Sequence, residues 1–351
     1  MPDTPPENGS AVALQDADGN ALGTGIFDAR DPQAAWRRFS WDPEAVFDLD
    51  YIVETMEAAV QRRPEESCLR LIHSDADYLP GLTIDLLQEV LLVTTTTAAM
   101  DAHLPAILEV LMEGYQPREI LIRNDSSARA AFALPQAIKT YSGNPLKGFW
   151  IEVDALRYRV DPADPEKPLF PLEQREQFSL VGSLCGGRSV LDLYGNAGAF
   201  ALQALKQAAT SATVVHPNAE YLKVVGANAQ RNCQQVEVIA GDPATYLAEA
   251  SIGQFECITI DPPAELEGGA ATLAQLQSDA FRCLPAGGVL ATYCRDPEFS
   301  ADAFEALVTE AAAHAGREAR LFARIAQPFD FPILLNLSTS QVLSGLILQV
   351  E

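Results

Sequence analysis

The C-terminal half of the chain alternates short apolar runs with longer segments of helical character. The apolar runs are SVLDLY from residue 189, SATVVH from 211, QVEVIA from 235, CITID from 257 and GVLATYC from 288. Strands that are separated by crossover helices run parallel to one another. The alternation therefore predicts an α/β fold with a Rossmann-like, doubly wound sheet over residues 165–351.

Residues 11–164 follow a different pattern, with strand-like runs around few helices. The segment 11–27 alternates apolar and turn residues about an Asp-Gly-Asn turn and predicts a hairpin, and 48–63 has apolar residues at helical spacing. A chain of 351 residues suits more than one core. We therefore predict four parts, with a boundary near residue 165: a flexible tail at 1–10, a hairpin region with a helix at 11–65, a small α+β domain ending in a hairpin at 66–164, and a Rossmann-like domain at 165–351.

Charge and hydropathy limit the partners and the location. The formal net charge is −24, which repels an extended phosphate backbone and weakens any binding of RNA. No run approaches the ~20 apolar residues that span a bilayer, and the N-terminus has no signal-peptide pattern. We expect a cytoplasmic protein that does not bind membranes.

The thiols and imidazoles are scattered. None of the six cysteines forms a C-x-x-C pair, and the four histidines are well separated in sequence. Metal-ligand spacing is therefore missing, and reduced, buried thiols are the expected state.

The segment Val190–Phe200, VLDLYGNAGAF, carries the strongest functional signal. An apolar strand runs into a glycine turn and then into a helix, whose N-terminus offers unpaired N–H groups to a ligand. An ordinary strand-to-helix joint is the alternative. The candidate ligand-binding residues of this loop are Asp192, Tyr194, Gly195, Asn196, Ala197 and Gly198.

Two further loops follow apolar strands of the same half. Asp242 comes after VEVIA, where its carboxylate could accept a hydrogen bond from an adenine amino group or could cap the helix that begins at Pro243. Asp261, Pro262 and Pro263 follow CITI. Because the carboxyl ends of parallel strands share one sheet edge, we expect these loops to meet the glycine turn in one crevice.

Together these motifs resemble the cytosolic PUA-containing methyltransferases that modify the C5 position of cytosine in large-subunit ribosomal RNA. The resemblance spans roughly residues 11–350. It implies S-adenosylmethionine (SAM) as cofactor and RNA as partner, and it places Gln174 and Arg175 beside the cofactor. The matching stretches are 70–72, 79–85, 122–125, 167–175, 190–200 and 261–263.

The chain departs from that family at two functional positions. His216 stands where the family has an acid that binds the ribose hydroxyls, and a lost charge-assisted hydrogen bond costs about 1.5–3 kcal/mol. His216 or Asn218 could supply a substitute contact to the cofactor, and a plain solvent-facing turn is the alternative. The family's nucleophilic cysteine aligns with Arg295, one residue after Cys294. Neighbouring strand residues point to opposite faces, so Cys294 is either an offset nucleophile or a buried structural thiol.

We predict a SAM-dependent methyltransferase in which Asp261 holds the acceptor and Cys294 is the candidate nucleophile. The hairpin at 11–27 resembles only the latter part of a PUA domain. A non-catalytic scaffold and a methyltransferase of a non-RNA substrate are the alternatives, and both the monomer and a homodimer stay open.

Overall fold

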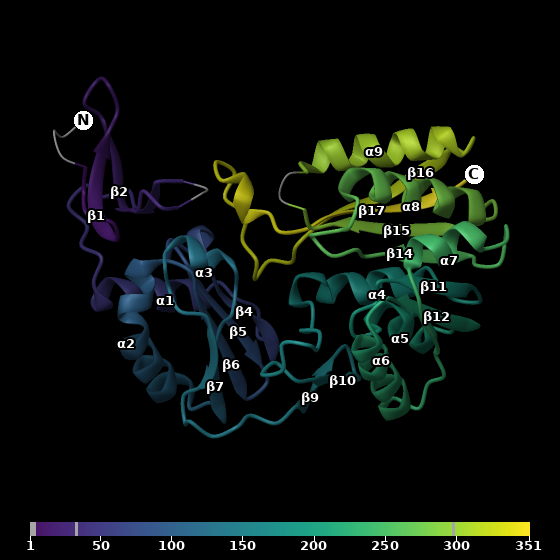
Figure 1. Cartoon of the computed structure of the whole chain (residues 1–351), viewed down its shortest axis with the longest axis horizontal. Helices are drawn as coiled ribbons and strands as arrows, with labels where there is room; N and C mark the ends of the chain where they lie inside the picture. The colour runs from purple at the N-terminus through teal and green to yellow at the C-terminus, as the bar shows by residue number, and fades with distance from the viewer. Residues whose placement is uncertain (1–4, 32–33, 297–298) are drawn as a thin grey trace. The chain divides into compact units, whose positions relative to one another are not determined.

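The computed structural model describes residues 5–31, 34–296 and 299–351. They form two compact units (Figure 1). The first comprises residues 1–147 and 329–340, and the second comprises 148–328 and 341–351. The first four residues of the predicted tail lie outside the described part, whereas Ser10 already belongs to a strand.

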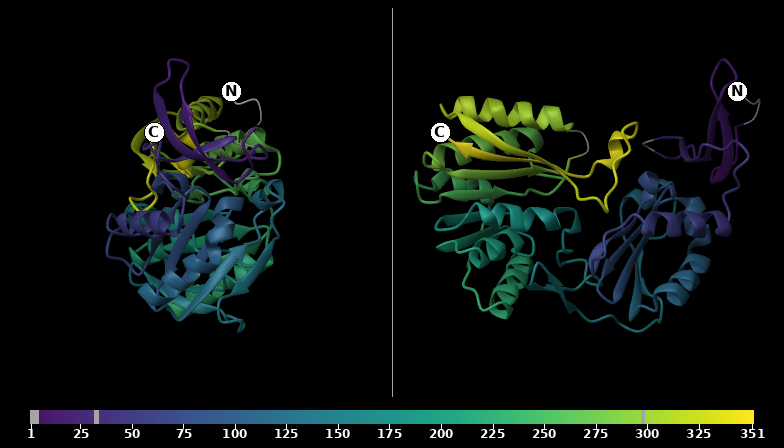
Figure 2. Two further views of the ribbon diagram at one scale, coloured as in Figure 1. Left: turned by 90° about the vertical axis from the view of Figure 1, so that its left-hand side faces the viewer. Right: turned by 180° about the vertical axis from the view of Figure 1, so that it is seen from behind.

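The first unit contains a five-stranded sheet in the order β4-β5-β6-β7-β8. Helices α1 (Leu49–Val60) and α2 (Ala98–Tyr115) lie together on one face of it (Figure 2). Asp48 caps α1 and Thr97 caps α2 through their side-chain oxygens. The strands are β4 (Cys68–His73), β5 (Leu82–Leu87), β6 (Val90–Thr95), β7 (Glu119–Asn124) and β8 (Ala137–Thr140).

The predicted N-terminal hairpin is confirmed, as β1 (Ser10–Gln15) paired antiparallel with β2 (Ala21–Phe27). A third strand, β3 (Trp36–Ser40), extends it to a three-stranded sheet. Sequence analysis missed β3 because WRRFS carries two charged residues and shows no simple alternation. Within this small sheet the Trp36 indole donates to the Val12 carbonyl at 3.0 Å.

The second unit is built on a seven-stranded sheet in the order β13-β12-β11-β14-β15-β17-β16. Its first five strands are parallel, as predicted for the Rossmann-like half. Strand β17 runs antiparallel to both of its neighbours, β15 and β16. The strands are β11 (Ser189–Leu193), β12 (Ser211–His216), β13 (Glu237–Ala240), β14 (Cys257–Ile260), β15 (Val289–Cys294), β16 (Ala319–Ala326) and β17 (Ser344–Val350).

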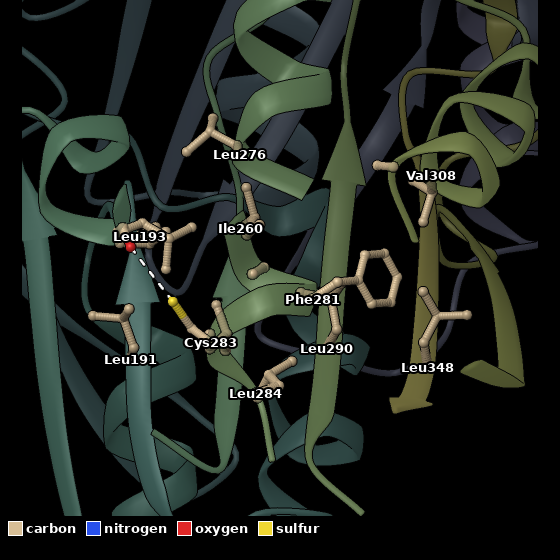
Figure 3. Packing of buried hydrophobic residues seen from close by; sticks show 14 of the residues in the cluster. Leu191, Leu193, Ile260, Leu276, Phe281, Cys283, Leu284, Leu290, Val308 and Leu348 are labelled. Atoms are coloured by element: carbon tan, nitrogen blue, oxygen red, sulfur yellow. Dashed lines mark hydrogen bonds between the residues drawn. The ribbon is translucent and has the colours of Figure 1, made fainter. Parts of the chain in front are cut away.

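Helices cover both faces of this sheet (Figure 1). On one face Phe178 of α4, Phe200 of α5 and Tyr293 of β15 pack ring on ring, with centroids 4.9 and 5.3 Å apart. On the other face Leu191, Leu290 and their neighbours pack against α8 and α9 (Figure 3). The helices are α4 (Arg175–Ser183), α5 (Ala199–Lys206), α6 (Ala219–Arg231), α7 (Pro243–Glu249), α8 (Gly269–Cys283) and α9 (Ala301–His314).

The hairpin of β9 (Phe149–Val153) and β10 (Leu156–Val160) groups with the second unit, not with the 66–164 part predicted for it. Two backbone N–H groups explain the difference, because Arg157 donates to Asn232 Oδ1 at 2.9 Å and Arg159 donates to Asn228 Oδ1 at 2.7 Å. The division therefore falls at residues 147–148 rather than near 165.

A second departure concerns residues 329–340, which belong to the first unit although they lie within the predicted C-terminal domain. The Asp330 carboxylate accepts the Arg70 backbone N–H at 2.7 Å, and the Phe331 ring lies 4.3 Å from the Arg70 guanidinium. Contacts so distant in sequence leave no periodic signal. Among the described helices, none has the length and apolar character needed to cross a bilayer.

Candidate functional site

The turns that follow the parallel strands of the second unit lie side by side. The Asp261 N–H donates to the Leu193 carbonyl at 3.2 Å, and the Tyr194 N–H donates to the Val215 carbonyl at 2.9 Å. The Gly241 N–H donates in turn to the His216 carbonyl at 3.3 Å. The strand ends predicted to share an edge are therefore hydrogen-bonded neighbours.

The glycine turn after β11 has a backbone that side chains would disturb. Gly198 has φ +71°, and a Cβ there would lie 2.9 Å from a Val225 methyl group. A Cβ on Gly195 would lie 2.6 Å from Asp192 Oδ2. Tyr194 also adopts a left-handed φ of +62°, which is uncommon for a residue with a side chain and marks a constrained turn.

Asp192 lies beneath this turn and is fully buried. Its Oδ1 accepts from the Thr259 hydroxyl at 2.7 Å, whereas Oδ2 accepts no hydrogen bond from any described residue. Burial raises the pKa of the Asp192 carboxyl to about 7. The Ala201 backbone, in the first turn of α5, is among the groups that oppose this rise.

His216 ends β12 and is buried among polar and aromatic groups. Its ring stacks on Tyr221 with centroids 4.4 Å apart, and its Nδ1 accepts the Asn218 N–H at 2.9 Å. Burial lowers the pKa of His216 to about 4, so the ring is neutral at pH 7. A neutral ring that accepts at Nδ1 carries its proton on Nε2. His216 can therefore donate one hydrogen bond to a ribose oxygen, where an acid would accept from the hydroxyls.

Asp242 performs the role that sequence analysis gave as the alternative to adenine binding. It caps α7, and its Oδ2 accepts from the Thr245 N–H at 2.8 Å and from the Thr245 hydroxyl at 2.7 Å. Both bonds end on Oδ2, so Oδ1 is the oxygen that remains for an adenine amino group. The cap and the ligand contact are compatible.

The polar cluster around Asp261 joins three chain segments. Gln174 is completely buried, and its Nε2 donates to Asp261 Oδ1 at 3.0 Å. Arg295 forms ion pairs with Asp261 and with Glu173, the latter at 3.1 Å. Burial alone would lower the pKa of Arg295, but the charges of Asp261 and Glu173 raise it above its ordinary value. The guanidinium is permanently charged beside the Asp261 carboxyl.

Cys294 points away from this cluster. Its side chain belongs to the hydrophobic cluster of Leu290, Phe304 and Leu346, and it is only 5% exposed. Burial raises the pKa of the Cys294 thiol above its ordinary value, which disfavours a thiolate. Of the two roles left open by the sequence, the contacts fit the structural thiol.

The remaining candidates lie along the same edge. Arg175 is buried at the start of α4, directly after Gln174, and Pro262 is buried after Asp261. The Ala197 carbonyl accepts from Asn228 Nδ2 at 2.9 Å, and Asn196 is partly exposed between the two glycines. Glu173 and Thr259 are members of the site that the sequence did not predict. Glu173 stands next to Gln174 in a matching stretch, but nothing marks Thr259 except its place in β14.

Known proteins resemble this chain in sequence and in fold. Residues 170–310 match the family model described as conserved hypothetical protein 95. The ribosomal RNA large subunit methyltransferase I of Shewanella amazonensis is 28% identical, over 98% of this chain and 91% of its own length. The enzyme of the same name from Aeromonas salmonicida is 27% identical, over 99% of this chain and 92% of its own.

Two solved structures share the whole architecture. A candidate SAM-dependent methyltransferase from Streptococcus mutans superposes with a TM-score of 0.83 at 17% identity, covering 99% of this chain and 93% of its own. A second candidate methyltransferase, crystallised with S-adenosylhomocysteine (SAH), gives the same TM-score at 16% identity, covering 98% of this chain and 92% of its own. The enzyme class that these findings support is SAM-dependent methyltransferase.

Proposed function

We propose that the protein transfers a methyl group from SAM to the RNA of the large ribosomal subunit. The observation that carries the proposal is that the turns after neighbouring parallel strands are hydrogen-bonded to one another. Beside these turns lie buried polar atoms that have no hydrogen-bond partner in the described part of the chain. Gln174 Oε1 and Arg295 Nη2 are two such atoms, with no hydrogen bond to any described residue. A buried polar atom without a partner costs about 1–3 kcal/mol, so these two atoms support the presence of a ligand at this edge.

The residues present fit an adenosyl and methionyl ligand. Gly195 and Gly198 allow close approach of the backbone, and the N-terminus of α5 has no side-chain cap. His216 would donate to the ribose, and Asp242 Oδ1 would accept from the adenine amino group. When bound, SAM supplies an electrophilic methyl group, and the part of the protein is to position an acceptor against it.

Ribosomal RNA is proposed as the substrate because proteins named ribosomal RNA large subunit methyltransferase I align with almost the whole chain. The proposed lining of the cofactor site also includes Arg175, Asn196, Ala197 and Pro262. The acidic surface predicts that RNA binding is weak and strongly salt-dependent. The cytoplasm is the location proposed with this substrate, and the three-stranded N-terminal sheet is the PUA-like part proposed to assist in holding RNA.

The test is methyl transfer from labelled SAM to unmodified large-subunit RNA made by transcription. We expect label in this RNA, and neither in small-subunit RNA nor in a protein fraction of the same extract. Asp261→Asn, which removes the acceptor-binding charge, should lose the label while the protein stays folded. Label in protein or in small molecules instead of RNA contradicts the substrate, and no label in any fraction contradicts the enzyme.

A further inference from the structure

The acceptor side of the site contains an arginine where thiolate chemistry would need a cysteine. Arg295 follows β15 directly, and its guanidinium pairs with Asp261 and Glu173. We propose that the acceptor is a nucleobase amino nitrogen, which is methylated directly without a covalent enzyme intermediate. This inference rests on the proposed function. Asp261 binds the amino group, and Arg295 positions Asp261.

The positions of the six thiols support direct transfer. Methylation of a pyrimidine carbon needs a thiolate that first attacks the ring. Cys68 is buried in the first unit, and the Cys185 and Cys257 sulfurs contact each other at 2.9 Å in the core of the second. Cys283 packs on the Leu247 and Ala250 carbonyls.

The last two thiols are no better placed. Cys233 follows α6, a crossover helix whose C-terminal end leads to the opposite, amino edge of the parallel strands. Cys294 alone stands at the carboxyl edge, and its side chain is in the hydrophobic cluster on the face covered by α8 and α9. The side chain that does reach Asp261 from this strand end is Arg295, because successive residues alternate between faces.

The cluster also has the hydrogen-bonding capacity to hold a polar acceptor. Arg295 Nη2 and Gln174 Oε1 are buried and make no hydrogen bond with the described residues, so the cluster offers one donor and one acceptor. The bonds from Gln174 and Arg295 both end on Asp261 Oδ1. Oδ2 is the oxygen left for an amino N–H. This combination suits the edge of a base that carries an amino group beside an acceptor atom.

The chemistry balances without another reactant. The lone pair of the acceptor nitrogen forms the new bond to the methyl carbon, while the carbon–sulfur bond breaks and its electron pair stays on sulfur. The donor thereby becomes SAH, and the positive charge passes from sulfur to nitrogen. The nitrogen then loses its extra proton to water, with Asp261 stabilising the charge in between.

The decisive experiment digests RNA methylated by the wild-type protein and identifies the modified nucleoside by mass spectrometry. We expect a nucleoside methylated on an amino nitrogen. Methyl on C5 of cytosine or on a ribose oxygen overturns this inference but leaves RNA methylation standing. RNA without label overturns the proposed function and this inference together.

A second readout does not depend on turnover. RNA containing 5-fluorocytidine traps enzymes that attack the ring with a thiolate, as an adduct that survives a denaturing gel. We expect no adduct, and an adduct overturns direct transfer. Cys294→Ala should keep the wild-type rate within about twofold, and a folded variant that loses tenfold or more counts against the inference. The adduct assay on the wild type decides the matter if this variant does not fold.

The positioning role of Arg295 is tested by a pair of variants. Arg295→Gln should lower kcat by roughly a hundredfold, as misplacement of a reacting group does, with little change in the affinity for SAH. Arg295→Lys should recover part of kcat because it restores the charge beside Asp261. Equal losses in both variants, or a loss confined to SAH affinity, contradict the role.

Discussion

Each unit buries an arginine in a polar cluster, but the two clusters complete their hydrogen bonds differently. In the first unit Arg129 is 1% exposed, and its side chain donates to Asp101, to the Thr95 hydroxyl and to the Pro135 carbonyl at 2.9–3.0 Å. In the second unit the cluster around Asp261 leaves Gln174 Oε1 and Arg295 Nη2 without a bond to the described residues. A completed network builds the fold, whereas an incomplete one at a sheet edge is available to a ligand.

Breaking the completed network should have the largest effect. Arg129→Ala leaves the Thr95 carbonyl and the Asp101 carboxylate without their buried donor, and we expect a loss of about 3–5 kcal/mol in the free energy of unfolding. Denaturant unfolding measures it, and SAH affinity should be unchanged in the folded variant because the site belongs to the second unit. Arg324→Ala, which breaks the exposed pair with Glu305, is the control and should leave the midpoint unchanged. Equal unfolding midpoints for the two variants would contradict the stabilising role of the Arg129 network.

The second prediction concerns how the buried Asp192 carboxyl makes stability depend on pH. Because its pKa is raised from 3.8 to about 7, the folded protein keeps a proton that the unfolded chain has lost. Native stability therefore falls as pH rises between these values and levels off above about 7. Asp192→Asn removes this loss and should be more stable than the wild type at pH 8, by at most roughly 4 kcal/mol, and nearly equal to it at pH 4. A stability difference that does not change with pH contradicts the buried charge.

Substitutions at His216 test which group contacts the ribose of the cofactor. His216→Asp restores an acceptor for the ribose hydroxyls, and a charge-assisted bond of about 1.5–3 kcal/mol should tighten SAM binding about tenfold or more. His216→Asn has no charge and is the matched control, for which we expect no gain. Calorimetric dissociation constants compare the two, and equal affinities would show that the ribose does not lie at this residue.

The smallest expected effect comes from the glycine turn. Gly195→Ala places a methyl group against Asp192 Oδ2, and overpacking of this kind costs about 1–3 kcal/mol, which we expect to appear as weaker SAM binding. Gly226→Ala is the control, because a Cβ there meets nothing within 4 Å and lies in helix α6. It should keep the affinity and slightly raise the stability. Equal binding by both variants contradicts the role of the turn.

Much of the second unit was predictable because its signals are local. Apolar runs at regular spacing revealed β11 to β15, and the glycine turn and Asp261 followed from their positions after strands. The return of residues 329–340 to the first unit, and the hairpin bound to Asn228 and Asn232, depend on tertiary contacts that no window of sequence contains.

The site shows the same limit. Strand alternation left Cys294 open between a nucleophile and a structural thiol, and its contacts fit the structural thiol. The ion pair of Arg295 with Glu173, and the bond from Thr259 to Asp192, join residues far apart in sequence. Chemistry carried by one segment was readable from the sequence, and chemistry carried by pairs of segments was not.

The most direct test of the central claim is a calorimetric titration of the folded wild-type protein with SAH, repeated with Gln174→Ala. We predict saturable binding of one ligand per chain, weakened in the variant because a buried contact beside the ligand is lost. Absence of heat at ligand concentrations on the order of a millimolar would contradict the claim that this sheet edge holds the methyl donor.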